Sequence, residues 1–545
     1  MLISLSFALI EKLQNYKDIE VFFLQILIKE SKNHNLLLQK IIQSKQEFQV
    51  ILEGDEENIS TFAQDLSCHI PLSLQWTFKD FAIVEKCNQS TPFLQNKSLE
   101  LLTPFELDSL CDAKNKDFCN LWGDFTSFVQ TKLTLLKENE KNQITNANEL
   151  KNALIFLANE LKSKKIIFIK TIFGKKKLIL FDENNPINKK EGLLFMPFDL
   201  NSAQGIFKTK QEELQALATL EKPIITFRPK TIFEDLFPLR EIPCILPFEP
   251  ILLLLSKFLN GFSGCYLFPL NDEKIANGLC YFIPSDSHPI HITVAKNSLI
   301  IPKRFQEKEN FALMEFQNTI QDENLEKVNA LYIGENKTEF LLYFNKSFKE
   351  AISFSFETNL GIFIDHLKET NKTTRSLLKN FTEKNEELIK YLESLPKQSK
   401  LSNNLLDLLG LCGIFLDFSN DIYESRKKLL HEAKNFMGEK GPRIDFKLQK
   451  NENNELFLHT FQTLRSVMSF KLAGVEKDLL CFGILDSLAE FLANLSRDME
   501  ENYTTKGLII SGALTLNKQF LDQLIHYLPK RSEIYVTKHC DVPLR

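Results

Sequence analysis

The sequence lacks the cysteine spacing of a zinc finger or a disulfide framework. Its 545 residues include ten cysteines, but none form a C-x-x-C pair and their spacing is irregular. The nine histidines are scattered, and only His288 and His291 lie close together. An H-x-x-H pair needs further ligands to hold a metal, so we expect no metal site and reduced, mostly structural thiols.

Long apolar runs are also missing. The first such run ends at Glu11, without a basic leader or a small-residue cleavage site. The most apolar stretch, 244–261, is interrupted by Glu249, two prolines and Lys257. A membrane-spanning helix needs about 20 apolar residues. We therefore predict a cytoplasmic protein without a transmembrane segment, in which 244–261 forms a buried loop and helix.

The chain has no excess of positive charge. Its net charge is −5 and its pI is near 6.1, whereas nucleic-acid proteins normally carry a basic face. A hydrophobic content of 43% with 25% charged residues is ordinary for a globular protein. The length exceeds what one core supports, so we expect three or four domains and no nucleic-acid partner.

Hydrophobic periodicity then defines the elements. The spacing of Leu150, Leu154, Leu157 and Leu161 predicts a helix with one apolar stripe. Strands are expected at 165–170 and 176–182, as a hairpin around Gly174. The remaining predictions are a strand, charged turn and helix over 47–66, strand–turn–strand over 325–344, two helices over 456–505, and strand–turn–helix–strand over 507–536.

The turn within "GLIISGALTLNKQF", residues 507–520, is the strongest candidate for binding chemistry. Backbone N–H groups of a Ser-Gly turn that leads into a helix can accept phosphate oxygens. The same turn is a normal connection in any α/β fold, and the full glycine-rich fingerprint is missing. Lys170, at the end of its strand, could likewise meet an anion or remain solvated. Both interpretations stay open from the residues alone.

Taken in order, several segments resemble HypF, the carbamoyltransferase family of [NiFe]-hydrogenase maturation. "VILEGDEENISTFAQDL" is similar to the family's V-E-G-x-x-x-x-L-x-x-F, and "CILPFEPILLLLSKFL" to V-M-L-P-Y-T-P-L-H-x-L-L. "ALYIGENKTEF" resembles L-A-L-G-G-E-L-K-N-T-F, and the 507–520 segment falls on V-L-S-G-G-V-F-Q-N. The likeness covers most of the chain, and the shared order of the segments carries it.

The resemblance implies a multidomain protein of α/β and α+β class. It places an acylphosphatase-like ferredoxin fold at 1–80 and a connector, the degenerate remnant of a zinc-finger region, at 81–145. A YrdC-like α/β domain follows at 146–308. A truncated ASKHA domain, similar to the ATPase-like carbamoyltransferase domain of the family, occupies 309–545.

The resemblance also implies a vestigial nucleotide site. We predict no cofactor, with ATP as the candidate ligand of that site. The positions that match the family's motifs are Lys170, Asn271, Gly334, Glu335, Lys337, Glu424, Ser511, Gly512 and Asn517.

At each departure from the family's motifs, a residue with a catalytic or ligand-binding role is missing. The arginine of the acylphosphatase motif is absent, the second glycine of S-G-G is Ala513, and the YrdC-like R-x-D-D-S becomes Thr293, Lys296 and Asn297. The H-H-H-A-H and N-D-G-G segments of the family's metal site have no counterpart. We therefore predict no catalytic and no metal-binding residues.

The sequence thus favours a non-catalytic accessory protein for assembly of a [NiFe] hydrogenase. It resembles in this the HydE-type proteins of Helicobacter-like and Campylobacter-like bacteria, and its expected partner is a hydrogenase subunit or another maturation protein. The alternative is an active carbamoyltransferase that uses carbamoyl phosphate and ATP in cyanide-ligand synthesis. A third possibility is an unrelated α/β protein whose segments match by chance.

Overall fold

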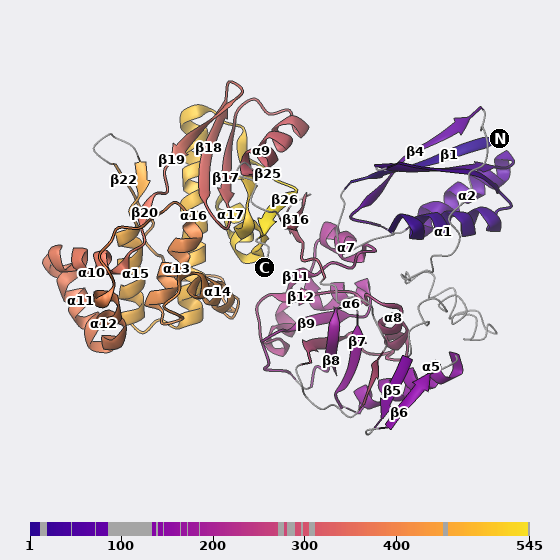
Figure 1. Ribbon diagram of the computed structural model, residues 1–545, viewed down its shortest axis with the longest axis horizontal. Helices are drawn as coiled ribbons and strands as arrows, with labels where there is room; N and C mark the ends of the chain where they lie inside the picture. The colour runs from indigo at the N-terminus through magenta and orange to yellow at the C-terminus, as the bar shows by residue number, and fades with distance from the viewer. Residues whose placement is uncertain are drawn as a thin grey trace. The chain divides into compact units, whose positions relative to one another are not determined.

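The computed structural model divides the chain into two compact units, shown in Figure 1. Unit 1 comprises 1–237 and 242–290, and unit 2 comprises 238–241 and 291–545. The residues that the structure describes are 1–10, 19–44, 46–70, 72–85, 133–137, 140–144, 147–163, 165–171, 173–184, 186–270, 277–280, 289–295, 298–304, 311–450 and 456–542.

Unit 1 begins with a four-stranded antiparallel sheet in the order β2-β3-β1-β4. Its elements follow one another as β1 (Leu2–Leu9), α1 (Ile19–Asn33), β2 (Leu37–Gln43), β3 (Glu47–Glu53), α2 (Glu56–His69) and β4 (Trp76–Val84). This βαββαβ order is the ferredoxin-like arrangement that the resemblance predicted. Alternate residues of β1 and β3 fill its core, because successive side chains of a strand point to opposite faces.

A ten-stranded mixed sheet forms the rest of unit 1, in the order β10-β11-β12-β9-β13-β8-β7-β14-β5-β6. Its strands are β5 (Leu133–Lys137), β6 (Glu140–Ile144), β7 (Ile167–Thr171), β8 (Gly174–Leu180), β9 (Leu194–Pro197), β10 (Phe207–Lys208), β11 (Ile225–Pro229), β12 (Ile242–Cys244), β13 (Gly264–Pro269) and β14 (Gly278–Cys280). Its helices are α5 (Ala147–Lys162), α6 (Leu200–Ile206), α7 (Gln211–Ala218), η2 (Thr231–Leu236) and α8 (Pro250–Lys257).

Two sequence predictions for this sheet are confirmed. The leucine stripe of α5 is buried in one core with α8, and β7 and β8 form the expected hairpin around Gly174. The apolar stretch 244–261 begins at the last residue of β12 and contains the buried helix α8, not a membrane span.

Two segments do not follow the predicted domain boundaries. Strands β5 and β6 fall within the expected connector 81–145, yet they pair with each other and with β14 as part of the large sheet. Residues 86–132, where the zinc-finger remnant was expected, lie outside the described residues. Strands β15 (Thr293–Ala295) and β16 (Ser298–Arg304), expected in the YrdC-like domain, belong instead to unit 2, because β16 pairs with β26 (His539–Val542).

Unit 2 is built on a five-stranded sheet in the order β19-β18-β17-β24-β25. The first three strands are antiparallel, whereas β24 and β25 run parallel to β17. The strands are β17 (Val328–Ile333), β18 (Thr338–Phe344), β19 (Ser347–Ile352), β24 (Gly507–Ser511) and β25 (Glu533–Val536). The predicted strand–turn–strand over 325–344 and strand–turn–helix–strand over 507–536 are therefore confirmed.

Helices and two small sheets complete unit 2. The helices are α9 (Phe311–Asp322), α10 (Leu360–Glu369), α11 (Lys372–Lys384), α12 (Glu386–Ser394), α13 (Leu405–Phe415), α14 (Ile422–Ala433), α15 (Thr460–Leu472), α16 (Lys477–Tyr503), η3 (Ala513–Leu516) and α17 (Lys518–Tyr527). The small sheets pair β20 (Phe356–Glu357) with β21 (Leu401–Ser402) and β22 (Leu448–Lys450) with β23 (Leu456–Leu458).

Helix α16 is the one helix among the described residues that is long and apolar enough to cross a membrane by length and composition. Within unit 2, however, 78% of the most apolar 18-residue stretch of this helix is buried. Its side chains belong to the main core, together with those of α13 and α15. Such burial is typical of the core helix of a globular domain, and a core helix can have the same length and apolar composition as a membrane span.

A tight turn after α7 joins the two sheets of unit 1. Leu220 packs into the core of the first sheet, and its N–H donates to the carbonyl of Leu72 at 2.9 Å. Glu221 is 1% exposed and accepts hydrogen bonds from Ser73 Oγ at 2.6 Å and from the N–H of Leu74 at 2.9 Å. Lys222 follows with a φ of 45° and is itself buried.

The buried amine of Lys222 makes stability depend on alkaline pH. Burial lowers its pKa from 10.5 to about 8, against the opposing attraction of Glu221. Between these values the unfolded chain binds the extra proton, so the free energy of unfolding rises as the pH rises from 8 to 10.5. We expect a rise of about 3 kcal/mol relative to Lys222→Met, measured by urea unfolding across that range. Parallel pH profiles for the two proteins would contradict it.

Candidate functional site

The predicted nucleotide positions of unit 2 gather where two parallel strands end. Strand β17 pairs with β24 so that Tyr332 lies opposite Ser511. Gly334 follows the first strand and Gly512 follows the second. The backbones are in close contact here, since a Cβ built at Gly512 would lie 2.4 Å from the carbonyl carbon of Ile333. The carboxyl ends of parallel strands are where open α/β sheets bind ligands.

The turn between β17 and β18 is held by internal contacts. Gly334 N–H donates to the carbonyl of Lys337 at 3.0 Å, and Lys337 Nζ lies 2.9 Å from Glu339 Oε1. Glu335 Oε2 lies 2.5 Å from Nη2 of Arg426 on α14. Asn404 Nδ2 donates to the Glu335 carbonyl at 2.6 Å. Both predicted side chains of this turn are therefore engaged in ion pairs within the protein.

Arg426 is a site residue that no sequence pattern indicated. Its side chain is 6% exposed, and its guanidinium lies 4.7 Å from the centre of the Tyr423 ring. A buried arginine needs both an anionic partner and apolar contact, and Glu335 and Tyr423 provide them. Glu335 lies 91 positions earlier in the chain, so only the fold could reveal the pair.

Glu424 lies in the first turn of α14. Asp421 caps this helix by accepting the N–H of Glu424 at 2.8 Å. The Glu424 side chain is 51% exposed, and Oε1 lies 3.3 Å from Lys427 Nζ. An exposed i,i+3 pair of this kind contributes about 0.5 kcal/mol or less. The structure therefore places Glu424 at the helix surface, whereas Glu335 points inward.

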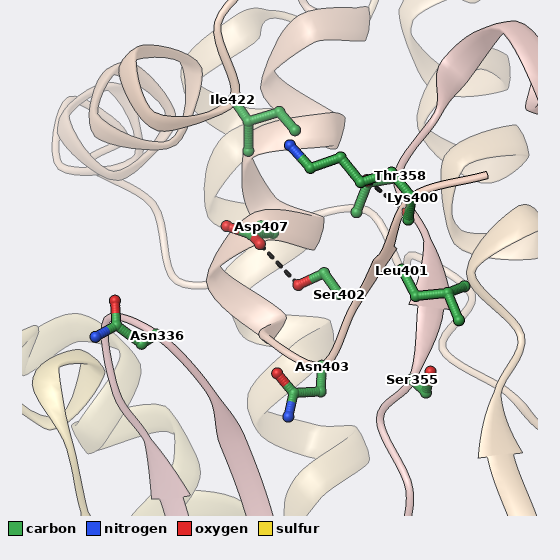
Figure 2. Close-up of a pocket in the computed structure, with 9 residues that line it drawn as sticks. All are labelled: Asn336, Ser355, Thr358, Lys400, Leu401, Ser402, Asn403, Asp407 and Ile422. Carbon is green, nitrogen blue, oxygen red and sulfur yellow. Dashed lines mark hydrogen bonds between the residues drawn. The ribbon is translucent and has the colours of Figure 1, made fainter. Parts of the chain in front are cut away.

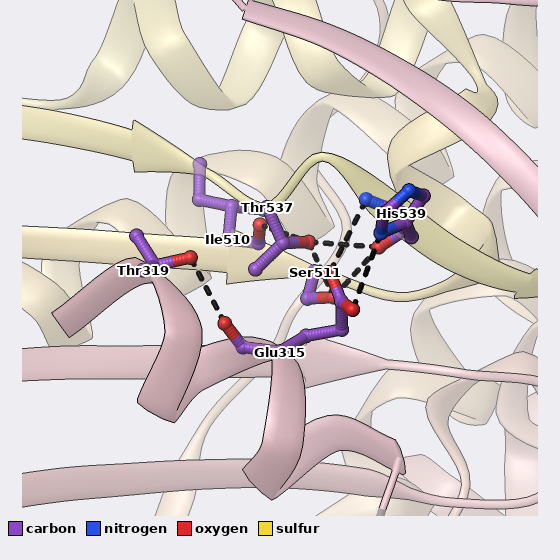
Figure 3. Close-up of polar contacts among 6 residues, drawn as sticks. All are labelled: Glu315, Thr319, Ile510, Ser511, Thr537 and His539. Atoms are coloured by element: carbon purple, nitrogen blue, oxygen red, sulfur yellow. Dashed lines mark hydrogen bonds and ion pairs between the residues drawn. The ribbon is translucent and has the colours of Figure 1, made fainter. Parts of the chain in front are cut away.

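Ser511 belongs to a buried polar cluster, drawn in Figure 3 with Glu315, Thr319, Ile510, Thr537 and His539. Its Oγ lies 2.6 Å from Thr537 Oγ1, which is also 2.9 Å from the carbonyl oxygen of His539. Glu315 Oε2 accepts the N–H of His539 at 3.3 Å, and Oε1 lies 3.3 Å from its Nδ1. Ser511 is 0% exposed, so its hydroxyl faces protein groups.

Asn517 has a structural task as well. Its side chain is the N-cap of α17 and accepts the N–H of Phe520 at 3.0 Å. A cap of this kind satisfies one of the free amides at a helix start and contributes about 1 kcal/mol. The serine and asparagine of the predicted loop thus stabilise the fold around it.

The remaining positions from the sequence analysis belong to other segments of the chain. Lys170 lies in β7 of unit 1, opposite Lys175 in the β7–β8 hairpin. Asn271, Lys296 and Asn297 lie outside the described residues. Thr293 belongs to β15 of unit 2, where its Oγ1 donates to the carbonyl of Leu516 at 3.0 Å.

A polar cavity of about 360 Å³ lies beside the β17–β18 turn, as Figure 2 shows. Asn336 from that turn reaches its wall. Ser402 Oγ donates to Asp407 Oδ2 at 2.7 Å, and Thr358 Oγ1 donates to the Lys400 carbonyl at 2.8 Å. Hydroxyls, amides, one amine and one carboxylate suit hydrogen bonding to a polar ligand. Sequence reasoning missed this cavity, because its walls come from segments far apart in the chain.

Metal binding finds no support within the part of the chain that the structure describes. No group of three or more His, Cys, Asp or Glu side chains there could hold an ion. Cys244, Cys265, Cys412 and Cys481 are buried thiols, and Cys280 is half-buried. Burial raises the pKa of Cys412 to about 12, so that thiol is not a nucleophile at neutral pH.

The two sheets of unit 1 and the mixed sheet of unit 2 define a multidomain α/β protein of HypF-like architecture. The chain is similar over 99% of its length to full-length HypF in a phosphate- and nucleotide-bound form, with a TM-score of 0.60 and 13% identity over 96% of that chain. HypF of T. kodakarensis matches to the same extent, with a TM-score of 0.59 and 12% identity. The predicted fold class is therefore confirmed.

A curated relative is similar along the whole sequence. Protein HydE of Wolinella succinogenes is 29% identical over 535 residues, which are 94% of this chain and 95% of that protein. No protein-family model matches the chain. The resemblance to HypF and to HydE-type proteins, inferred from scattered motifs, is confirmed by these end-to-end similarities.

Proposed function

We propose that the protein is an accessory factor for maturation of a [NiFe] hydrogenase and acts by binding another protein. The similarity to Protein HydE over 94% of the chain carries this proposal, because it spans every domain and not one module. The HypF-like fold over 99% of the chain adds support, since the family resemblance implies hydrogenase maturation. The proposed partner is a hydrogenase subunit or another maturation protein, met in the cytoplasm.

The state of the predicted loop supports binding over catalysis. Ser511 and Gly512 are buried, with the serine hydroxyl at 2.6 Å from Thr537 and the glycine in contact with the backbone of Ile333. A phosphate bound by the N–H groups of such a turn would have to approach this buried backbone. We therefore propose that the protein works without a cofactor, and that ATP is not required.

Deletion of the gene in its host tests the maturation role. We expect the deletion strain to lose most hydrogenase activity and to accumulate unprocessed large subunit. Activity staining and immunoblotting of the large subunit measure the two effects, and a plasmid copy of the intact gene controls for effects on neighbouring genes. Normal activity and processing in the deletion strain would remove the proposed role.

Complementation by two variants separates binding from catalysis. Lys170→Ala and Glu424→Gln alter predicted nucleotide residues whose side chains are not fully buried. We expect both variants to restore hydrogenase activity to roughly 80% or more of the level given by the intact gene, because we propose no chemistry at either position. Folding should also be retained, since surface substitutions change stability by about 0.5 kcal/mol or less.

The catalytic alternative predicts the opposite result. Purified protein would then release pyrophosphate from ATP in the presence of carbamoyl phosphate, and Lys170→Ala would abolish both this turnover and complementation. That outcome would replace a binding factor with an active carbamoyltransferase.

A further inference from the structure

A second cavity of about 490 Å³ in unit 2 has mainly apolar walls. Leu360 comes from α10, Leu392 from α12, and Leu411 and Ile414 from α13. These four side chains are at most 4% exposed, so the walls are part of the hydrophobic core. Cavities of this size with apolar walls and a few polar groups are typical of small-molecule sites.

The apolar cavity adjoins the polar cavity of Figure 2. Thr358, Lys400 and Ile422 line both. The polar side adds the hydroxyl of Ser402 and the carboxylate of Asp407, whereas the apolar side adds the leucines described above. A ligand that occupies both cavities would therefore need one apolar end and one polar end.

The loop 395–400 forms the wall at the junction, and its backbone is firmly held. Asn359 Nδ2 donates to the carbonyls of Pro396 and Gln398 at 2.5 and 2.8 Å. The N–H of Lys400 donates to Glu357 Oε1 at 2.9 Å, and its carbonyl accepts from Thr358 N at 2.8 Å. The position of the Lys400 Cα is thus fixed by hydrogen bonds on both sides of the residue.

The ammonium group of Lys400, in contrast, has no partner among the residues described here. Figure 2 shows the side chain extending from the loop toward Ile422, across the junction. The neighbouring carboxylates already accept hydrogen bonds, since Glu357 binds Ser399 Oγ at 2.6 Å and Asp407 binds Ser402 Oγ. Lys400 is the charged side chain that lines both cavities, whereas the Asp407 carboxylate lines only the polar cavity and keeps its negative charge.

We propose that the joined cavities bind a small amphipathic anion. Its apolar body lies between Leu360, Leu392 and Ile414, and its anionic group pairs with Lys400. An anion on an apolar body matches both features, because the ammonium supplies charge-assisted hydrogen bonds and the leucine walls remove apolar surface from water. This site is separate from the proposed maturation role and requires no chemistry on the ligand.

Titration of the full-length protein with octanoate, octan-1-ol and octylammonium in a calorimeter tests the proposal. We expect saturable 1:1 binding of octanoate, at least about tenfold tighter than that of the other two. Lys400→Met should weaken octanoate binding by about tenfold or more. Its folding should be unaffected, since only the backbone of Lys400 makes the contacts that hold the loop.

Lys397→Met is the matched control. It removes a lysine from the same loop, but this lysine pairs with Asp365 and does not line either cavity. We expect octanoate affinity to stay within about twofold of the unaltered protein, because screened surface charges act weakly at a distance. Leu395→Trp, at a half-buried position of the apolar wall, should abolish binding by filling the cavity while the thermal midpoint is retained.

Several results would overturn the site. If octan-1-ol or octylammonium bound as tightly as octanoate, the proposed preference for an anionic ligand would be wrong. Lys400→Met binding octanoate as tightly as the unaltered protein would remove the role of the ammonium. Absence of saturable binding by octanoate to the folded protein would exclude the site altogether.

Discussion

Gly512→Ala is expected to destabilise unit 2 by about 3 kcal/mol or more. The backbone of Gly512 has a φ of +102° and a ψ of 171°, a region that residues with a Cβ rarely enter. The added Cβ would also lie 2.4 Å from the carbonyl carbon and oxygen of Ile333 in β17. The two effects add, because backbone strain costs about 1–3 kcal/mol and overpacking against a rigid strand costs a similar amount.

Gly474→Ala is the matched control for this substitution. Gly474 has a φ of +82°, but no atom lies within 4 Å of a Cβ built there. We expect a loss of only about 1 kcal/mol, from the left-handed backbone alone. Equal losses at the two positions would show that contact with Ile333 contributes nothing.

The distribution of tryptophan makes the measurement specific to one unit. Trp76 is buried in the core of the first sheet of unit 1, and the sequence of unit 2 (238–241 and 291–545) contains no tryptophan. Urea unfolding of Gly512→Ala should therefore shift part of the transition seen by far-ultraviolet circular dichroism to lower urea. The transition seen by tryptophan fluorescence should stay in place. A shift of the fluorescence transition alone would contradict the assignment of the effect to unit 2.

Glu221→Ala is expected to cost unit 1 about 3 kcal/mol. The carboxylate is 1% exposed and also accepts the N–H of Gln75 at 3.2 Å, in addition to Ser73 and Leu74. Its removal leaves buried donors without an acceptor and Lys222 without its nearest negative charge. Each unsatisfied buried donor costs about 1–3 kcal/mol, and breaking a buried pair of charges costs about 3–5.

Fluorescence is the sensitive probe for this second variant. Trp76 is 7% exposed and its N–H donates to Ser73 Oγ at 3.1 Å, so it reports on the turn directly. Glu212→Ala, at an exposed position of α7, is the control and should change stability by about 0.5 kcal/mol or less. A Glu221→Ala midpoint that moves no further than the control would contradict the anchoring role of this carboxylate.

The elements of the fold were predictable where a local pattern dictates them. The leucine spacing of α5 defines one helical face, and the hairpins at Gly174 and Gly334 follow from short apolar runs around a glycine. Their mutual placement was not predictable in this way. Strand β6 (EKNQI) is polar, as is typical of a connector, yet β5 pairs with β14 and β6 pairs with β5 at the edge of the sheet.

The candidate site shows the same division. The sequence predicted that Ser511 and Asn517 flank a strand–turn–helix, and the structure has that connection as β24, η3 and α17. It could not predict that Thr537 and Glu315 would surround the turn, because Thr537 reaches it through the pairing of β24 with β25 and Glu315 comes from helix α9, much earlier in the chain. Arg426 and Lys400 were missed for the same reason, since an isolated basic residue in a helix or loop has no distinguishing pattern.

Helix α16 has a consequence for how the protein is made. The ribosome releases 27 residues here that, taken alone, have the length and apolarity of a membrane anchor. Helices α13 and α14, which pack in the same core, lie earlier in the chain and so emerge first. A folding platform is thus available when α16 leaves the exit tunnel, and rapid docking on it would shield the nascent segment from the membrane-targeting machinery. Docking of α16 on α13 and α14 during synthesis is therefore expected to favour a high yield of folded protein.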